Sequence, residues 1–319
     1  MQYEDKDDSK IIHIGFDDTD SISGKCTTNL AFKIVSELTN EKRVTFVDYP
    51  LLVRLNPNIP WKTRGNGAVC IRIKTNRSEQ IIEFLLRILK SESDILNGAN
   101  PGLAIFEGES IPFSLRQFSG KAMNNVVKME EAEKLAAQLS VQIFKFGQGL
   151  GIIGAMASIG SLLEGDHTYE AIAYRKDEYV GSPRMLDKSK VSRVDINTYP
   201  LTFNCYDKIH DRILIAPHGP DPVFCGIRGE DPQIVISSLH DVMPMERLEG
   251  YMVFRTNQGT NMHLQNELSQ SEIRTHRAGY VRCAVTKNPV TIRGGHVMFE
   301  VSDFSNNKYP VAVYEPTGL

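Results

Sequence analysis

Short apolar runs alternate with amphipathic stretches along the first third of the chain. The runs have the apolar character and polar flanks typical of strands, and they fall at 11–16, 44–47, 68–73 and 103–106. Helical periodicity separates them twice, around residues 30–38, where Thr27 or Thr28 is the expected N-cap, and at 79–89. The order β-α-β-β-α-β across residues 11–107 is the ferredoxin-like pattern.

The rest of the chain continues as a second α/β region from about residue 112 to 275. Its patterns predict helices near 115–127, 130–139 and 233–240, and strands near 169–173, 212–216 and 251–255. From 277 to 315 the helical period is lost, and strand-like runs are separated by Asn-Pro, Gly-Gly and Asn-Asn. That pattern predicts a small β-barrel or part of one. The expected fold class is therefore α+β.

Composition narrows the partners and the location. The 36 basic and 39 acidic residues give a net charge of −3, so any RNA contact must come from local basic patches. The five cysteines include no C-x-x-C pair, which indicates a reducing compartment. Residues 1–10 are polar and acidic, unlike a signal peptide, and no apolar run is long enough to span a membrane. We expect a cytoplasmic protein with no membrane partner.

The strongest chemical signal is the acidic loop Asp17-Asp18-Thr19-Asp20, directly after the first predicted strand. Carboxylates this close repel one another, and a hard cation stabilises such a cluster, usually magnesium together with nucleotide phosphates. Two alternatives remain open. The loop could be a solvated turn with Asp18 as a cap. It could also be the aspartate-nucleophile motif of the haloacid-dehalogenase phosphatases, although that motif needs Thr or Val where Ile22 stands.

A possible phosphate cradle follows the acidic loop. Gly24, Lys25, Thr27 and Thr28 stand at the start of the expected helix, where free backbone N–H groups and the helix dipole favour an anion. The spacing is not that of a Walker A loop. Simple N-capping by the threonines is the alternative.

Residues 56–67 combine two prolines, the only tryptophan, basic side chains and glycines in one short connection. Lys62 and Arg64 could hold a triphosphate, and Trp61 could stack on a flipped base. The alternative is a surface loop that Trp61 anchors to the core.

Two further patterns are weaker. Gly149, Gly151 and Gly154 match the dinucleotide-binding fingerprint, but a glycine-rich turn that allows close helix packing explains them equally well. Four possible zinc ligands have a spacing that fits no standard pattern: Cys205, His210, His218 and Cys225.

Taken together, these motifs resemble one family. The most specific are Gly15-Phe-Asp-Asp-Thr-Asp-Ser21 and Pro60-Trp-Lys-Thr-Arg-Gly-Asn-Gly-Ala68, and the others lie at 24–28, 54–57, 149–155, 226–230 and 256–263. The sequence is similar to the archaeal 2-agmatinylcytidine synthetases (TiaS), which act on the minor isoleucine tRNA.

The resemblance implies a ligase with ATP and Mg2+ as cofactors, and with agmatine and the isoleucine tRNA of CAU anticodon as partners. ATP would phosphorylate the 2-oxo group of the wobble cytidine. The amine of agmatine would then attack the ring carbon and expel phosphate, giving agmatidine, with ATP ending as AMP. The modified tRNA would decode AUA.

The resemblance also assigns roles to residues. Thr27 takes the place of the threonine that becomes phosphorylated, and Thr27, Asp18 and Asp20 form the expected catalytic set. The expected metal ligands are Asp17, Asp18 and Asp20. The expected nucleotide-binding residues are Asp17, Lys25, Thr28, Lys62, Arg64, Gly65 and Asn66. The agmatine pocket is not located, and its candidates are Asp221, Glu230 and Asp241.

The family is built from a kinase-like α/β domain, a ferredoxin-like domain, an OB-fold and a zinc ribbon. We therefore expect an ATP- and magnesium-binding catalytic region at 1–125, a second α/β region at 126–275 with ferredoxin-like and remaining catalytic elements, and a partial OB-fold at 276–319. No four-cysteine ribbon is present in the sequence. Two other hypotheses stay open: a different magnesium-dependent phosphoryl-transfer enzyme, either a small-molecule kinase or an aspartate-nucleophile phosphatase, and a non-catalytic RNA-binding protein.

Overall fold

The computed structural model describes residues 9–41, 44–242, 246–264, 266–293 and 295–314. The expectation for residues 1–10 and the end of the strand-rich stretch 277–315 extend beyond these described residues.

The N-terminal elements follow the predicted order, with one added strand. They are β1 (Lys10–Asp17), α1 (Thr27–Thr39), β2 (Val44–Phe46), β3 (Leu51–Arg54), β4 (Gly67–Thr75), α2 (Ser78–Glu92), η1 (Ile95–Asn97) and β5 (Gly102–Glu107). The sequence pattern missed β3. The predicted N-cap of α1 is wrong, because Cys26 takes that position with extended backbone and Thr27 and Thr28 are already helical and buried.

The second α/β region holds more elements than its periodicity showed. It contains α3 (Phe113–Asn124), α4 (Met129–Leu139), β6 (Gln142–Lys145), α5 (Ile152–Gly160), β7 (Thr168–Arg175), η2 (Asp177–Tyr179), α6 (Lys188–Thr198), β8 (Thr202–Phe203), β9 (Tyr206–Asp207), β10 (Arg212–Ile213), β11 (Val223–Gly229), α7 (Pro232–Val242), β12 (Leu248–Thr256), η3 (Met262–Leu264) and η4 (Gln270–Glu272). The expected helices and strands are present, and the additions include β6, α6, β8, β9, β11 and the three short 3-10 helices.

One sheet unites the two regions. Its strand order is β6-β5-β1-β4-β3-β12-β7-β11-β8, with β2 also paired to β4. The join is a parallel pairing of β3 with β12, in which Leu51 and Leu52 lie opposite Arg255 and Thr256. Strands some 200 residues apart in sequence thus become neighbours, and the structure is a mixed α+β fold around one large sheet.

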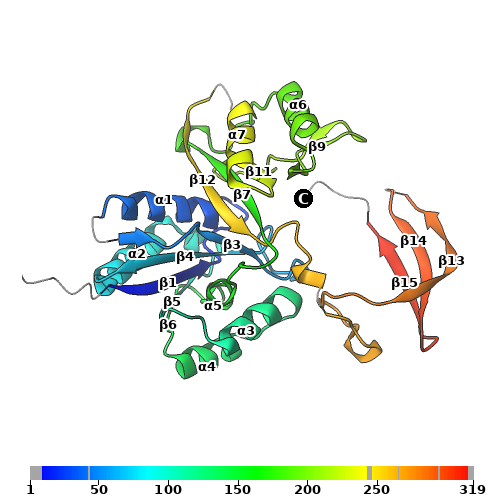
Figure 1. Ribbon diagram of the computed structural model, residues 1–319, viewed down its shortest axis with the longest axis horizontal. Helices are drawn as coiled ribbons and strands as arrows, with labels where there is room; N and C mark the ends of the chain where they lie inside the picture. Colours follow the sequence, from blue (N-terminus) through cyan, green and yellow to red (C-terminus); the bar gives the residue numbers. More distant parts are fainter. Residues whose placement is uncertain (1–8, 42–43, 243–245, 265, 294, 315–319) are drawn as a thin grey trace, which may run out of the picture.

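Helices cover both faces of this sheet (Figure 1). On one face of β1, Ile12, Ile14 and Phe16 pack against α1 and α2, and α3, α4 and α5 build a second core on the opposite face. A third core lies under α6 and α7, against β7 and β11. The helix α5 lies directly on β1. The contact is so close that a Cβ on Gly15 would lie 2.1 Å from the carbonyl oxygen of Ala155, so only glycine fits there.

The C-terminal strands form a separate antiparallel sheet, β13 (Cys283–Thr291), β14 (Val297–Asp303) and β15 (Lys308–Val313), which stands apart from the main body (Figure 1). Within the described residues it does not close into a barrel. No helix in the described part of the chain has the length and apolarity needed to cross a membrane.

Candidate nucleotide and metal site

The acidic loop starts where β1 ends, above the first turn of α5. Asp18 has a left-handed backbone with φ 57°, a conformation that Asp tolerates better than most residues, and it turns the chain out of the strand. A Cβ on Gly154 would lie 1.9 Å from Oδ2 of Asp17, and one on Gly151 would lie 2.4 Å from the Asp17 carbonyl oxygen. The glycine fingerprint therefore serves close packing of α5 against the acidic loop.

Burial and mutual repulsion perturb the three carboxyl groups. The pKa of Asp17 rises to about 8, mainly because burial disfavours its charged form, with Asp18 and Asp20 adding repulsion. Burial and the Asp20 charge raise the pKa of Asp18 to about 7, although the Asn100 backbone N–H donates to it. Burial also raises the pKa of Asp20 to about 6, with Arg64 opposing the shift. A cation placed among these groups would relieve the repulsion.

Arg64 connects residues 56–67, the basic aromatic loop, to the acidic loop. Its guanidinium donates to the carbonyl oxygens of Lys25 at 2.9 Å and Ser21 at 3.0 Å. Its Nη1 also lies 3.4 Å from Oδ2 of Asp20 and 3.8 Å from Oδ2 of Asp221. The predicted neighbourhood of the two loops is therefore present.

Asp221 completes this cluster from the loop before β11. Its side chain is buried, and Arg184 contacts its Oδ1 at 3.3 Å, whereas its Oδ2 has no hydrogen-bond partner in the described structure. The other two agmatine candidates lie elsewhere. Glu230 is exposed beyond the far end of β11, and Asp241 is exposed on α7. The position of Asp221 between two prolines was the only sequence signal for it.

The threonine pair occupies the first turn of α1. The hydroxyl of Thr19 donates to Oγ1 of Thr27 at 3.0 Å, and the Thr27 side chain lies close enough to Asp20 to oppose the rise in the pKa of that carboxyl. Thr28 faces Cys26, with 3.1 Å between Oγ1 and Sγ, and its carbonyl oxygen accepts from Tyr174 at 2.9 Å. Thr27 is thus part of the acidic cluster, whereas the described contacts of Thr28 are with Cys26 and Tyr174 and not with the carboxylates.

The remaining candidates divide between open and structural positions. Lys62 and Trp61 are exposed, Trp61 by 64%, so this tryptophan does not anchor the loop to the core. The ammonium of Lys25 pairs with Glu92 at 3.4 Å. Gly65 leaves room for Arg54, and Asn66, with φ 48°, donates to the carbonyl oxygen of Asn56 at 2.7 Å.

A buried network of ion pairs around Glu170 holds Arg54, at the end of β3 where the basic aromatic loop begins. Glu170, only 3% exposed, accepts from Nη2 of Arg54 at 3.2 Å and from Nε of Arg228 at 3.1 Å. Nε of Arg54 also donates to Gln258 at 2.9 Å. The sequence analysis assigned no chemical role to the motifs at 54–57, 226–230 and 256–263. The structure brings one residue from each of them into this network.

No three Asp, Glu, His or Cys side chains among the described residues are arranged to hold a metal ion together. This statement covers the acidic loop as well as the four possible zinc ligands. Magnesium often takes only one or two carboxylates and completes its octahedral shell with phosphate oxygens and water. The carboxylates of the acidic loop fit a magnesium ion that takes one or two protein ligands, and the Arg64 guanidinium lies beside them, where it could contact a phosphate.

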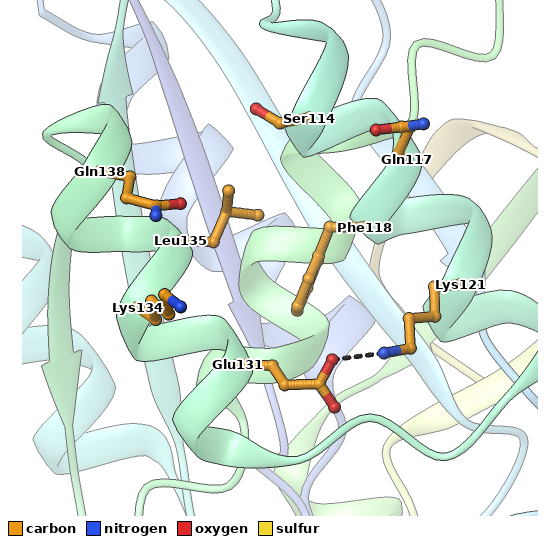
Figure 2. A pocket seen from close by; sticks show the side chains of 8 residues that line it. All are labelled: Ser114, Gln117, Phe118, Lys121, Glu131, Lys134, Leu135 and Gln138. Carbon is orange, nitrogen blue, oxygen red and sulfur yellow. Dashed lines mark hydrogen bonds and ion pairs between the residues drawn. The ribbon is translucent and has the colours of Figure 1, made fainter.

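A hollow of about 370 Å3 lies elsewhere, between α3 and α4. Figure 2 shows Phe118 and Leu135 facing each other across it, with an ion pair between Lys121 and Glu131 beside them. None of its lining residues belongs to the candidate site.

Carboxylates, a hydroxyl pair and a guanidinium meeting at one strand end are the groups that phosphoryl-transfer enzymes use. Comparison with known proteins narrows this class. The TiaS TCKD domain family matches residues 13–84, and the TiaS FLD domain family matches residues 149–263.

A curated relative from Cenarchaeum symbiosum, the isoleucine-tRNA 2-agmatinylcytidine synthetase TiaS, is 41% identical over 308 residues, which cover 97% of this chain and 68% of that protein. The crystal structure of TiaS in complex with an isoleucine tRNA and ATP superposes with a TM-score of 0.88 at 32% identity, over 97% of this chain and 73% of the other. The crystal structure of TiaS with the same tRNA, AMPCPP and agmatine gives a TM-score of 0.86 at 31% identity, over 97% and 74%. The chain belongs to the TiaS family, and the resemblance seen in its motifs is confirmed.

Proposed function

We propose that this protein is an ATP-dependent ligase that joins agmatine to carbon C2 of the wobble cytidine in the CAU anticodon of the minor isoleucine tRNA. The product is agmatidine, which allows the tRNA to decode AUA. One observation carries the assignment to this site: Arg64 bridges the acidic loop and Asp221, in a chain 41% identical to an isoleucine-tRNA 2-agmatinylcytidine synthetase.

The reaction needs a leaving group at C2. Transfer of a phosphoryl group from ATP to the 2-oxo oxygen supplies one, since the C–O bond can then break with phosphate carrying the oxygen away. The primary amine of agmatine forms the new C–N bond and loses a proton. A base in a single-stranded anticodon loop can leave its stack to react.

Within this scheme the site residues take the following roles. One or two of the carboxylates of Asp17, Asp18 and Asp20 would supply oxygens to magnesium, whose charge would offset that of the phosphates. Arg64 contacts the transferred phosphoryl group. Lys62 reaches the phosphates from its exposed position in the same loop.

Thr27 is the proposed acceptor of one phosphoryl group of ATP, and the 2-oxo oxygen is the acceptor of the other, so that ATP ends as AMP. The Thr27 side chain lies beside Asp20, which is therefore placed to take the proton when the oxygen attacks phosphorus. Lys25, Thr28, Gly65 and Asn66 complete the proposed nucleotide-binding set. Thr28 acts by fixing the first turn of α1, and Gly65 and Asn66 act by fixing the backbone of the loop that carries Arg64.

Asp221 is the proposed acceptor for the cationic end of agmatine. Oδ2 of this buried carboxylate accepts no hydrogen bond in the described structure and faces the Arg64 guanidinium only at 3.8 Å, so an ammonium or guanidinium group could donate to it. Glu230 and Asp241 lie away from the cluster and are not assigned this role.

We further propose that residues 1–125 form the kinase-like catalytic region, that 126–275 contribute ferredoxin-like and remaining catalytic elements, and that 276–319 are part of an OB-fold. The five free cysteines agree with the cytoplasmic location that we propose for this enzyme.

The test is to incubate the protein with ATP, magnesium, agmatine and the unmodified minor isoleucine tRNA, and to analyse the nucleosides by mass spectrometry. Agmatidine is expected only when all components are present. Its absence under every condition, with tRNA binding intact, would leave the RNA-binding hypothesis in its place.

Two variants separate the ligase from other phosphoryl-transfer enzymes. Thr27→Ala should abolish labelling of the protein by γ-labelled ATP, and Thr39→Ala, a control at the exposed far end of α1, should retain that labelling. Label that is instead lost with Asp18→Asn and kept with Thr27→Ala would identify an aspartyl phosphate and thus a phosphatase-type enzyme.

A further inference from the structure

A second hollow, of about 480 Å3, lies at the far end of α5 from the acidic loop. It is lined by the C-terminal half of α3, the C-terminal end of α5, Met262 and Asn266. It shares no residue with the candidate catalytic site. The nine residues of α5 separate the two by about 13 Å at 1.5 Å per residue.

Three buried polar groups in the lining of this hollow have no hydrogen-bond partner. They are Oγ of Ser119, Oδ1 of Asn124 and Oγ of Ser161, in residues 2%, 4% and 4% exposed. A buried polar group without a partner destabilises the folded protein, so three residues with such a group around one hollow indicate a ligand that supplies the missing hydrogen bonds.

The chemistry of the lining defines that ligand. Because Nδ2 of Asn124 already donates to the carbonyl oxygen of Gly120 at 3.0 Å, Oδ1 remains as an acceptor, and the two serine hydroxyls can donate or accept. Met123, Leu162 and Met262 provide apolar contact surface. A flat group with an apolar face and both donors and acceptors on its edge, such as a nucleobase, matches these features.

The rim of the hollow is basic. Arg116 and Lys121 are exposed lining residues, and none of the described lining residues is acidic. Arg116 lies over the Phe113 ring at 5.6 Å, which holds its guanidinium at the surface. Lys121 pairs with Glu131 on the side of the neighbouring hollow (Figure 2). Two cations beside a polar hollow suit the phosphate of a nucleotide.

We propose that this hollow binds one nucleotide of the RNA substrate other than the cytidine that reacts. The proposal rests on the proposed function, since it assumes that the substrate is a tRNA. The volume lies within the 300–1,000 Å3 range of small-ligand pockets, enough for one nucleotide but not a base pair. The hollow also borders the path to the C-terminal sheet, because the carbonyl oxygen of Asn124 accepts from the Ala278 backbone N–H at 2.9 Å.

The first test removes the unpartnered hydroxyls with the double substitution Ser119→Ala and Ser161→Ala. Two hydrogen bonds of about 0.7 kcal/mol each correspond to a tenfold loss of tRNA affinity, measured by filter binding without ATP or agmatine. The melting temperature should stay the same or rise, because an unsatisfied group is replaced by an apolar one. Ser238→Ala is the matched control, since its Oγ is equally buried and unpartnered but lies on α7.

The second test acts at the surface and does not depend on how the core tolerates substitution. Arg116→Gln should weaken tRNA binding and lower the slope of log affinity against log salt concentration by about one. Arg87→Gln is the control. Arg87 is likewise exposed on a helix and lies over a phenylalanine, at 5.9 Å from the Phe84 ring, but α2 covers the opposite face of the sheet.

The outcomes separate the possible sources of the nucleotide. Weaker tRNA binding with both variants, unchanged agmatidine formation at saturating tRNA and unaffected controls support the proposal. Free nucleoside monophosphates that bind the parent and not the double variant, with tRNA affinity unchanged, would overturn the RNA assignment in favour of a free nucleotide. Unchanged affinity for both ligands would overturn the site altogether. A chain that forms no agmatidine but still shows these affinity losses would refute the proposed function alone.

Discussion

The buried network around Glu170 provides the sharpest test of how the basic aromatic loop is held. Glu170→Gln keeps the shape of the side chain and removes the charge that Arg54 and Arg228 share. Removing one partner of a buried ion pair costs about 3–5 kcal/mol. The arginine side chains are 24% and 13% exposed, so water partly compensates them. We therefore expect the free energy of unfolding to fall by about 3 kcal/mol, measured by urea denaturation at pH 7.

The pH dependence of this loss has a defined sign. Burial alone would raise the pKa of Glu170, but the charges of Arg228 and Arg54 outweigh it and hold the pKa below the ordinary value of 4.5. The stabilisation that the Glu170 charge gives to the folded protein is therefore complete above about pH 4.5. It is lost as pH falls through the lower pKa of Glu170 in the folded state. The difference between the parent and Glu170→Gln should shrink in that acidic window.

The control is Glu107→Gln, which breaks an exposed pair with Lys10 in which the side chains are 34% and 68% exposed. Its effect should stay below about 1 kcal/mol. If Glu170→Gln costs no more than this control, or if its effect grows as pH falls below 4.5, then burial of the network does not determine its contribution and the reasoning is refuted.

Three further predictions follow from the site. Gly154→Ala should displace Asp17 and reduce agmatidine formation at least tenfold in a nucleoside mass assay, whereas Gly165→Ala, which has open space around it, should not. Arg64→Lys keeps a positive charge but loses the fork that contacts two carbonyl oxygens, and we expect a higher KM for ATP in steady-state kinetics, with normal activity counting against the bridge. Burial lowers the pKa of His13 below 6.5, so the contribution of His13 to the free energy of unfolding should fall as pH drops below 6.5. A denaturation series in which the difference between the parent and His13→Gln does not change over that range would contradict this.

Much of the fold could be predicted because local patterns determine it. The strand before the acidic loop, the helix after it and the amphipathic helix at 79–89 all follow from apolar periodicity, and each is present as β1, α1 and α2. The prediction of a threonine N-cap was wrong because the turn at Lys25, with φ 62°, places Cys26 at the cap position and starts the helix at Thr27.

Long-range relations could not be predicted in the same way. Nothing in the local pattern indicates that β3 pairs with β12, since parallel pairing across some 200 residues depends on the whole sheet. The place of Asp221 beside Arg64 depends on that pairing as well. The meeting of the acidic and basic loops was expected from chemistry, and the structure brings them together through Arg64.

The parallel pairing of β3 with β12 has a mechanical consequence for the catalytic cluster. Asp20 and Asp221 come from segments on either side of this join, and rotating one segment against the other would break main-chain hydrogen bonds in the middle of the sheet. Such bonds sit among the least easily opened parts of a protein. Substrate entry should therefore rely on movement of the surface loops, and the spacing between the two carboxylates should be nearly the same before and after binding.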